Sequence, residues 1–150
     1  TTRALTQFTL ITPTLDHVFL FGFVTFALVG LVYHIVPQLA GARWPAPRWI
    51  ELHWKLAVSA LGLLATAGLM GGYLHGVALL NPEVQFTTVI KTYVPFVGLT
   101  TLAWLVLLAG NMLLALNLVR LLFARGRATC LPVAKALLQP AQPVAAEAKA

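Results

Sequence analysis

The stretch from Leu15 to Val36, LDHVFLFGFVTFALVGLVYHIV, decides the fold of this chain. It is almost wholly apolar, and as a helix it is long enough to cross the hydrocarbon layer of a bilayer, which is about 30 Å thick. Two further stretches, from His53 to Leu74 and from Tyr93 to Leu122, have the same character. The sequence therefore predicts an all-α integral membrane protein with three transmembrane helices.

The composition favours the same class. Of the 150 residues, 59% are hydrophobic and 9% are charged, whereas soluble domains carry about 25% charged residues. The net charge of +6 comes from residues that flank the apolar stretches, so we attribute it to topology and anionic lipid and expect no nucleic-acid partner. No carboxylate lies in the middle of a span, which argues against a self-contained pump or carrier. The single cysteine, Cys130, excludes an internal disulfide.

Basic residues are distributed unevenly between the two sides of the predicted bundle. One side has Arg3 and Lys91. The other side has the basic residues of the first loop and of the segment after the third span: Arg43, Arg48, Lys55, Arg120, Arg125, Arg127 and Lys135. By the positive-inside rule, the N-terminus is outside and the C-terminus is cytoplasmic. We therefore expect an outer segment over residues 1–14, a three-helix domain over residues 15–125 and a flexible cytoplasmic tail over residues 126–150.

Local signals predict the ends and the packing of the helices. Thr12 fits an N-cap, Pro13 the first turn of the first helix, and Pro37 its end. Asn111 and Asn117 are polar groups in the third span that we expect to hydrogen-bond to another helix or to a partner subunit. The second span carries a stripe of small residues, which allows close approach either of a helix or of a cofactor plane: Gly68, Gly72 and Gly76.

Four histidines fall near the ends of the first two predicted spans, and imidazole is a good axial ligand for haem iron. Antiparallel pairing of the spans brings His17 and His75 to the outer face and His34 and His53 to the inner face. We name His17 and His75 as the stronger candidate pair for the iron of a b-type haem and the other two as the weaker pair. The alternative is that histidines near the end of a span simply reach head groups or water.

Several segments resemble a known family. The stretch from Ala4 to Phe19 and the stretch GLVYHIVPQL from Gly30 to Leu39 look like the tenth span of the catalytic subunit of C-family (cbb-type) haem-copper oxidases. That span begins with a His-Val-His type motif and ends in a Tyr-x-x-Val-Pro-x-Leu type motif. The stretch from Leu52 to Ala57, together with the glycines Gly68, Gly71 and Gly72, resembles the eleventh span, and that from Asn111 to Leu122 resembles the end of the twelfth. Nitric oxide reductase large subunits share the pattern more distantly.

The chain departs from that family at the ligand positions. The resemblance implies that His17 matches the histidine that binds the high-spin haem, while Phe19 stands where the family has the ligand of the low-spin haem. The spans that carry the copper ligands have no counterpart here, so copper is not expected and the chain alone is not catalytic. The resemblance implies the last three spans of such a subunit, in a chain that needs partners.

Two hypotheses follow from these patterns. The first is an integral membrane subunit of a respiratory, oxidase-like electron-transfer complex in a bacterial-type inner (plasma) membrane, with b-type haem as its candidate cofactor. Its partners are other membrane subunits and lipid, with a cytochrome c or a quinone reached through those subunits. The second is a non-catalytic structural or assembly subunit that packs against the same partners without a cofactor.

Overall fold

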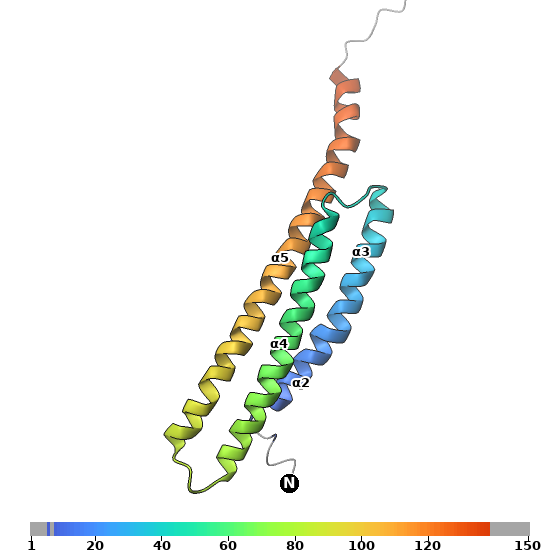
Figure 1. Ribbon diagram of the computed structural model, residues 1–150. Coiled ribbons are helices and arrows are strands. Elements are labelled where there is room, and N and C mark those ends of the chain that lie inside the picture. Colours follow the sequence, from blue (N-terminus) through green and yellow to red (C-terminus); the bar gives the residue numbers. More distant parts are fainter. Residues whose placement is uncertain (1–5, 7, 139–150) are drawn as a thin grey trace, which may run out of the picture.

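The computed structural model describes residue 6 and residues 8–138, and the regular secondary structure in that part of the chain is entirely helical (Figure 1). Residues 1–5, 7 and 139–150 lie outside it, and with them Arg3, most of the predicted outer segment and the last part of the predicted tail. The helical elements are α2 (Ile11–Phe19), the π-helical turn η1 (Leu20–Thr25), α3 (Phe26–Ala40), α4 (Pro47–Leu80) and α5 (Phe86–Leu138).

These elements form three rods that are long and apolar enough to cross a membrane: Ile11–Ala40, Pro47–Leu80 and Phe86–Lys135. The prediction of an all-α fold is therefore confirmed for the described residues, with three helices that are long and apolar enough to span a membrane. Each helix is longer than its predicted apolar stretch. The 34 residues of α4 correspond to about 50 Å of helix, which exceeds the 40–45 Å of a bilayer with its head groups. The length of α4 is therefore sufficient to cross a bilayer from one head-group layer to the other.

The first rod begins and ends elsewhere than predicted. Its helix starts at Ile11, whose backbone N–H donates to the Thr9 hydroxyl at 3.4 Å, so the predicted cap at Thr12 is wrong. At the other end, the helix passes through Pro37 and stops at Gly41, where φ is +59°. The N–H groups of the two residues after the helix donate to Gln38 O at 3.2 Å and to Pro37 O at 3.1 Å. This is the left-handed closure that a glycine at this position permits.

The third rod is longer than expected at its C-terminal end. We predicted a flexible tail over residues 126–150, loosely ordered from Thr129, but α5 continues as a helix to Leu138. The residues after Leu121 are mostly leucine, alanine and arginine, which are strong helix formers. Pro132 lacks only one N–H donor, and the carbonyl that it leaves unpaired lies on an exposed part of the helix.

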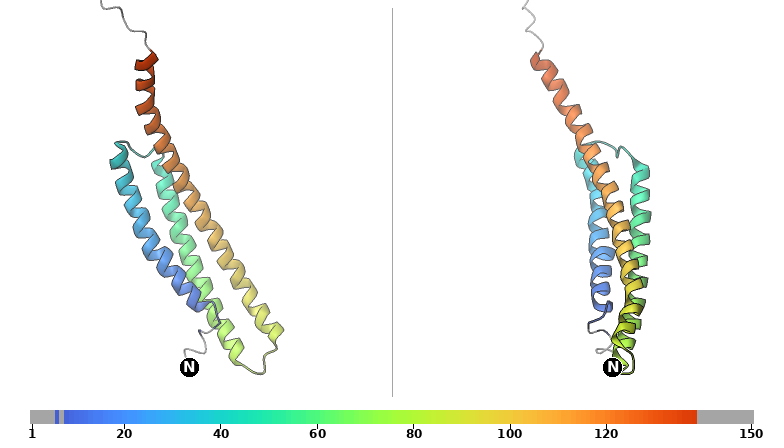
Figure 2. Two further views of the ribbon diagram at one scale, coloured as in Figure 1. Left: turned by 180° about the vertical axis from the view of Figure 1, so that it is seen from behind. Right: turned by 90° about the vertical axis from the view of Figure 1, so that its left-hand side faces the viewer.

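The core of the bundle lies between α4 and α5, which run antiparallel and side by side in every view (Figures 1 and 2). The buried contact cluster consists of Ala57 and Ala60 from α4 and Leu107 from α5. The alanines have small side chains, so the two helix backbones can approach closely. The first rod packs on this pair through α2 and η1, while α3 makes few contacts with α5.

The π-helical turn η1 aligns the aromatic side chains of the first rod. Phe21 and Phe26 are five residues apart, which in a regular α-helix would point them about 140° away from each other. In the structure both pack against the core cluster. The wider turn, in which the Thr25 hydroxyl donates to Leu20 O at 3.0 Å, therefore brings two large side chains onto one face.

The glycine stripe of α4 is a packing surface for protein. A side chain at Gly68 would collide with the Thr14 side chain, and one at Gly72 would meet the backbone nitrogen of Ile11 at 2.7 Å. The helix that approaches the stripe is therefore α2. The alternative that a cofactor plane lies on this face does not fit, because α2 fills the space at Gly68 and Gly72.

Candidate functional site: the four histidines

The first rod and α4 are staggered, so His17 lies deep in the bundle and not at its outer face. Ile11 packs against Gly72, and Thr14 packs against Gly68. Because the two helices are antiparallel, one further turn along α2 brings His17 to about the level of Leu64, close to the middle of α4. The imidazole of His17 meets the Trp104 ring edge-on, with ring centroids 5.0 Å apart. It is half-buried and has no hydrogen-bond partner among the described residues.

His75 lies near the end of the bundle closed by residues 81–85, which we call the Pro82 end. Its ring stacks on that of Tyr93 from α5, with centroids 4.4 Å apart and an interplanar angle of 30°. The Nδ1 atom is buried and has no hydrogen-bond partner in the described part of the chain. An unpaired buried polar atom lowers stability by about 1–3 kcal/mol. The Nδ1 atom therefore does not stabilise the described part of the bundle through a hydrogen bond.

His17 and His75 are not brought together. The residues that they contact on α5, Trp104 and Tyr93, are eleven residues apart, which corresponds to about 16 Å of helix rise. Two axial ligands of one haem iron must lie on opposite sides of the same atom, so this pair does not fit that role in the folded chain. The expectation that the two imidazoles lie at the same level is therefore not met, because sequence periodicity carries no information on the stagger between helices.

His53 lies near the opposite end of α4, which is closed by residues 41–46 and which we call the Trp44 end. It is 3% exposed. Its Nδ1 atom and the hydroxyl group of Tyr33 on α3 are hydrogen-bonded at 2.6 Å. On its other side it contacts α5, where Gly110 leaves room for the ring and the side chain of Asn111 interacts with the imidazole. One buried side chain thus links all three rods.

Further hydrogen bonds surround this link. Because Pro37 has no N–H, the carbonyl of Tyr33 lacks its helical donor, and the indole Nε1 of Trp44 donates to it at 3.1 Å. The buried amide of Asn117 on α5 pairs with the backbone of Ala46: Ala46 N donates to Oδ1 at 3.3 Å and Nδ2 donates to Ala46 O at 3.2 Å. We predicted that the two asparagines of α5 hydrogen-bond to another helix or to a partner subunit, and Asn117 does so with Ala46, the N-cap residue of α4.

His34 does not pair with His53. Its side chain is exposed, and the Gln38 side chain donates to its Nε2 atom at 3.1 Å. The neighbouring residue, Tyr33, is the one that faces His53. Within this chain, the weaker predicted histidine pair therefore does not fit axial coordination of one haem either.

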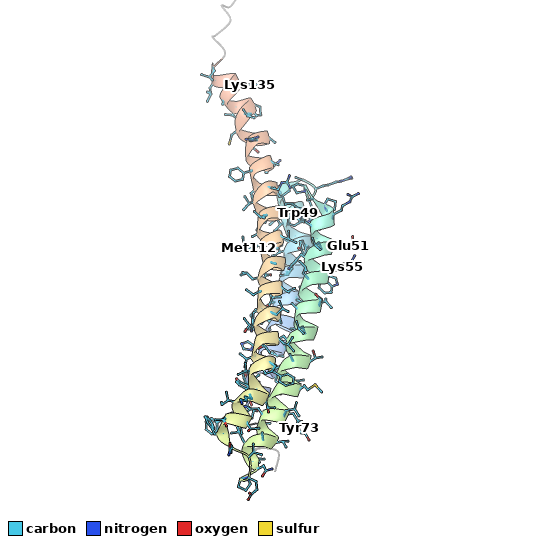
Figure 3. All side chains as sticks on the ribbon, turned by 60° about the vertical axis from the view of Figure 1, so that its left-hand side comes forward. Trp49, Glu51, Lys55, Tyr73, Met112 and Lys135 are labelled. Atoms are coloured by element: carbon cyan, nitrogen blue, oxygen red, sulfur yellow. The ribbon has the colours of Figure 1, made fainter. Side chains whose placement is uncertain are left out.

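The carboxylate nearest in sequence to His53 does not orient it. Glu51 forms an ion pair with Lys55 at 2.7 Å. Figure 3 shows both side chains on the outside of α4. Tyr33 and Trp44 are the functional neighbours that the sequence reasoning missed. The position of Pro37, four residues after Tyr33, was the available signal, because it marks a carbonyl that needs another donor.

The chain matches no family model, and the comparisons with curated proteins and with solved structures found no match. The interpretation of the four imidazoles therefore rests on geometry alone: one links the helices, one is solvent- or lipid-facing, and two are half-buried without polar partners among the described residues.

Proposed function

We propose that this chain is a non-catalytic structural subunit of a respiratory, oxidase-like complex in a bacterial-type inner membrane, with its N-terminus outside. The observation that carries the proposal is that the first rod packs on the other two helices along one side and leaves its other side uncovered by the described part of the chain. No residue in the most apolar stretch of Ile11–Ala40 is buried. The large side chains of Phe23, Leu28 and Leu31 are 67%, 57% and 54% exposed. A helix held along one side only has room for neighbouring subunits on the other.

The respiratory part of the proposal rests on the resemblance to the last three spans of cbb-type catalytic subunits. In that comparison the chain keeps the apolar spans and the glycines but lacks the ligand at Phe19. The polar contacts of His53 support a structural role, because its Nδ1 atom is engaged with Tyr33. A subunit that uses its most buried histidine to hold three helices together suits a packing role better than a catalytic one.

A second candidate function is favoured by the position of His17. An imidazole at the middle of the bundle without a hydrogen-bond partner among the described residues is unusual in a membrane, where such groups are costly. His17 could supply one axial ligand to a b-type haem whose other ligand belongs to a partner subunit. Such a haem, when bound, would supply one-electron transfer.

The packing function is tested by isolating the tagged chain from membranes in mild detergent. The proposal predicts that other membrane subunits of a redox-active complex copurify with it, seen by mass spectrometry and by quinol or cytochrome c oxidation. Leu28→Ala with Leu31→Ala should lower their retention several-fold, because the exposed face of the first rod loses contact area. The matched control is Leu105→Ala with Leu108→Ala on α5, where the leucines are 58% and 57% exposed. Isolation of the chain without redox-active partners would contradict the proposal.

The proposed orientation is tested separately by labelling. In a Cys130→Ser background, a cysteine introduced by Ala42→Cys lies in the loop of the Trp44 end. The positive-inside rule predicts that an impermeant maleimide reaches it from the cytoplasmic side only. Efficient labelling of intact cells from outside would overturn the orientation and leave the packing experiment unaffected.

A further inference from the structure

The last part of α5 extends past the rest of the bundle. Asn117 and Arg120 are level with the Trp44 end, because they contact Ala46 and Trp49. The residues from Leu121 to Leu138 continue beyond that level in the same direction (Figures 1 and 2) for about 26 Å of helix rise. If α4 crosses the bilayer, its length already exceeds the bilayer thickness, and this extension then reaches the aqueous phase.

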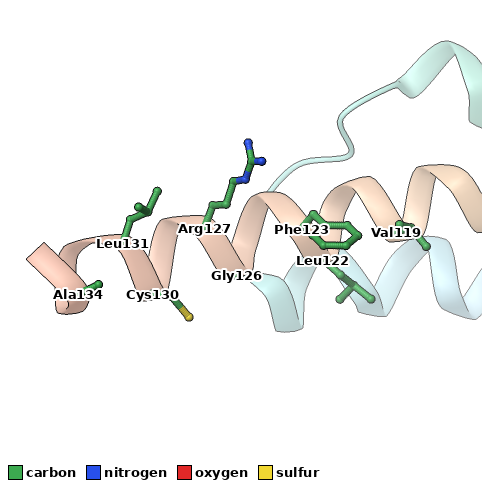
Figure 4. Close-up of a pocket in the computed structure, with 8 residues that line it drawn as sticks. All are labelled: Val119, Leu122, Phe123, Gly126, Arg127, Cys130, Leu131 and Ala134. Atoms are coloured by element: carbon green, nitrogen blue, oxygen red, sulfur yellow. The ribbon is translucent and has the colours of Figure 1, made fainter.

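One face of the extension is an open apolar groove (Figure 4). Phe123 and Leu131 are 70% and 54% exposed on it. The groove residues recur at intervals of three and four, which places them on one face of the helix: Val119, Leu122, Phe123, Gly126, Arg127, Cys130, Leu131 and Ala134. At Gly126 nothing lies within 4 Å of the position that a Cβ atom would take, so the groove has free space there. An apolar face of this length in water normally marks a protein interaction site.

The margin of the groove is basic. A second hollow adjoins it, formed by Arg120 and Arg127 together with Pro45, Phe123 and Ala124. The guanidinium group of Arg120 lies 5.0 Å above the ring of Trp49, which fixes its direction. Among the described residues, the acidic side chain nearest in sequence to Trp49 is Glu51, and it is paired with Lys55. The two arginines therefore have no carboxylate partner in the described part of the chain.

We propose that the groove binds an amphipathic helix of a partner subunit, with an apolar stripe at three-and-four spacing and carboxylates along its edge. The apolar stripe would pack on Phe123 and Leu131, and a large side chain would fill the space at Gly126, as a knob fits a hole. The carboxylates would pair with Arg120 and Arg127. The inference rests on the proposed packing function and names the chemistry of the partner.

Two other occupants fit the observations less well. In a parallel pair formed with a second copy of this chain, Arg120 and Arg127 of both copies would face each other without a counter-charge. A membrane surface rich in anionic lipid would require the extension to lie in the bilayer plane, whereas it continues in the direction of the transmembrane part of α5 (Figure 2).

The experiment uses two synthetic helical peptides that share one leucine stripe and differ at the edge, which carries glutamate in one and lysine in the other. Fluorescence anisotropy measures their binding to the full chain in phosphatidylcholine nanodiscs. The glutamate peptide should bind at least tenfold more tightly than the lysine peptide. Arg120→Glu with Arg127→Glu should reverse that preference, and Gly126→Leu should weaken both peptides by filling the groove. Lys91→Glu at the Pro82 end is the matched charge control and should change neither affinity.

Each other result overturns the docking proposal. Equal binding of both peptides, or a preference that survives the arginine reversals, would show that Arg120 and Arg127 do not select an acidic partner. Protection of Cys130 from maleimide by phosphatidylglycerol nanodiscs, with no peptide binding, assigns the groove to the membrane surface. A disulfide between two Cys130 residues that forms at once under mild oxidant assigns it to a second copy. Retention of partner subunits through the first rod is measured independently, so failure of the groove is distinguishable from failure of the packing function.

Discussion

The Trp44 end and the Pro82 end of the bundle each contain one histidine of α4, but they are held together by different interactions. At the Trp44 end, His53 is hydrogen-bonded to Tyr33 at 2.6 Å and lies among further polar contacts. Toward the Pro82 end, close contact comes from Gly68 and Gly72, and His75 keeps a buried nitrogen without a partner in the described residues. Residue type alone therefore does not assign a role, because only one of the two imidazoles is hydrogen-bonded to another helix among the described residues.

The largest effect is expected from filling the glycine contact. A leucine side chain in Gly72→Leu would meet the backbone nitrogen of Ile11, which cannot move without moving α2. We expect a destabilisation of about 3 kcal/mol or more, measured by SDS-induced unfolding of the detergent-solubilised protein. Gly98→Leu is the control, because nothing lies within 4 Å of its Cβ position. Equal stability of the two variants would mean that α2 does not pack on the stripe.

The next effect concerns the polar contact at the other end. His53→Ala removes a buried ring and leaves the Tyr33 hydroxyl without its partner, so we expect a loss of about 2–3 kcal/mol. His34→Ala is the matched control, since that histidine is exposed and its hydrogen-bond partner in the described part of the chain is Gln38 on its own helix. A loss of similar size in both variants would show that His53 has no special structural role.

A smaller change isolates the hydrogen bond itself. Tyr33→Phe keeps the ring and removes the hydroxyl group, so it should cost about 1 kcal/mol, as is typical of hydrogen bonds between membrane helices. In the double variant with His53→Ala, the two losses should not add, because they remove the same interaction. Full additivity would contradict the 2.6 Å contact.

The smallest effect is expected at His75. His75→Phe keeps the stack on Tyr93 and removes the unpartnered nitrogen, so stability should stay within about 0.5 kcal/mol or rise. A loss above about 2 kcal/mol would show that the nitrogen has a partner in the assembled protein. In that case His75 would again be a candidate ligand of haem iron.

The sequence predicted those features that depend on one helix at a time. The three spans follow from unbroken apolar stretches, and the glycine stripe follows from its spacing of four. The depth of His17 depends on how far α2 is shifted along α4. The residue pattern of a single helix does not indicate this shift. Tyr33 was missed because its hydroxyl finds a partner on another helix. The helical extension to Leu138 was missed because alanine, proline and glutamine with scattered charges, as found from Thr129 onward, are typical of a loosely ordered tail.

The central claim is that the histidines of this chain are not paired as haem ligands within it. The most direct measurement is the reduced-minus-oxidised spectrum of the chain purified from membranes, compared with its His17→Ala and His75→Ala variants. We expect no low-spin b-type signal to depend on both residues. The rings contact Trp104 and Tyr93 on α5, which are separated by about 16 Å of helix rise. A low-spin b-type spectrum that disappears in each of the two variants would contradict it.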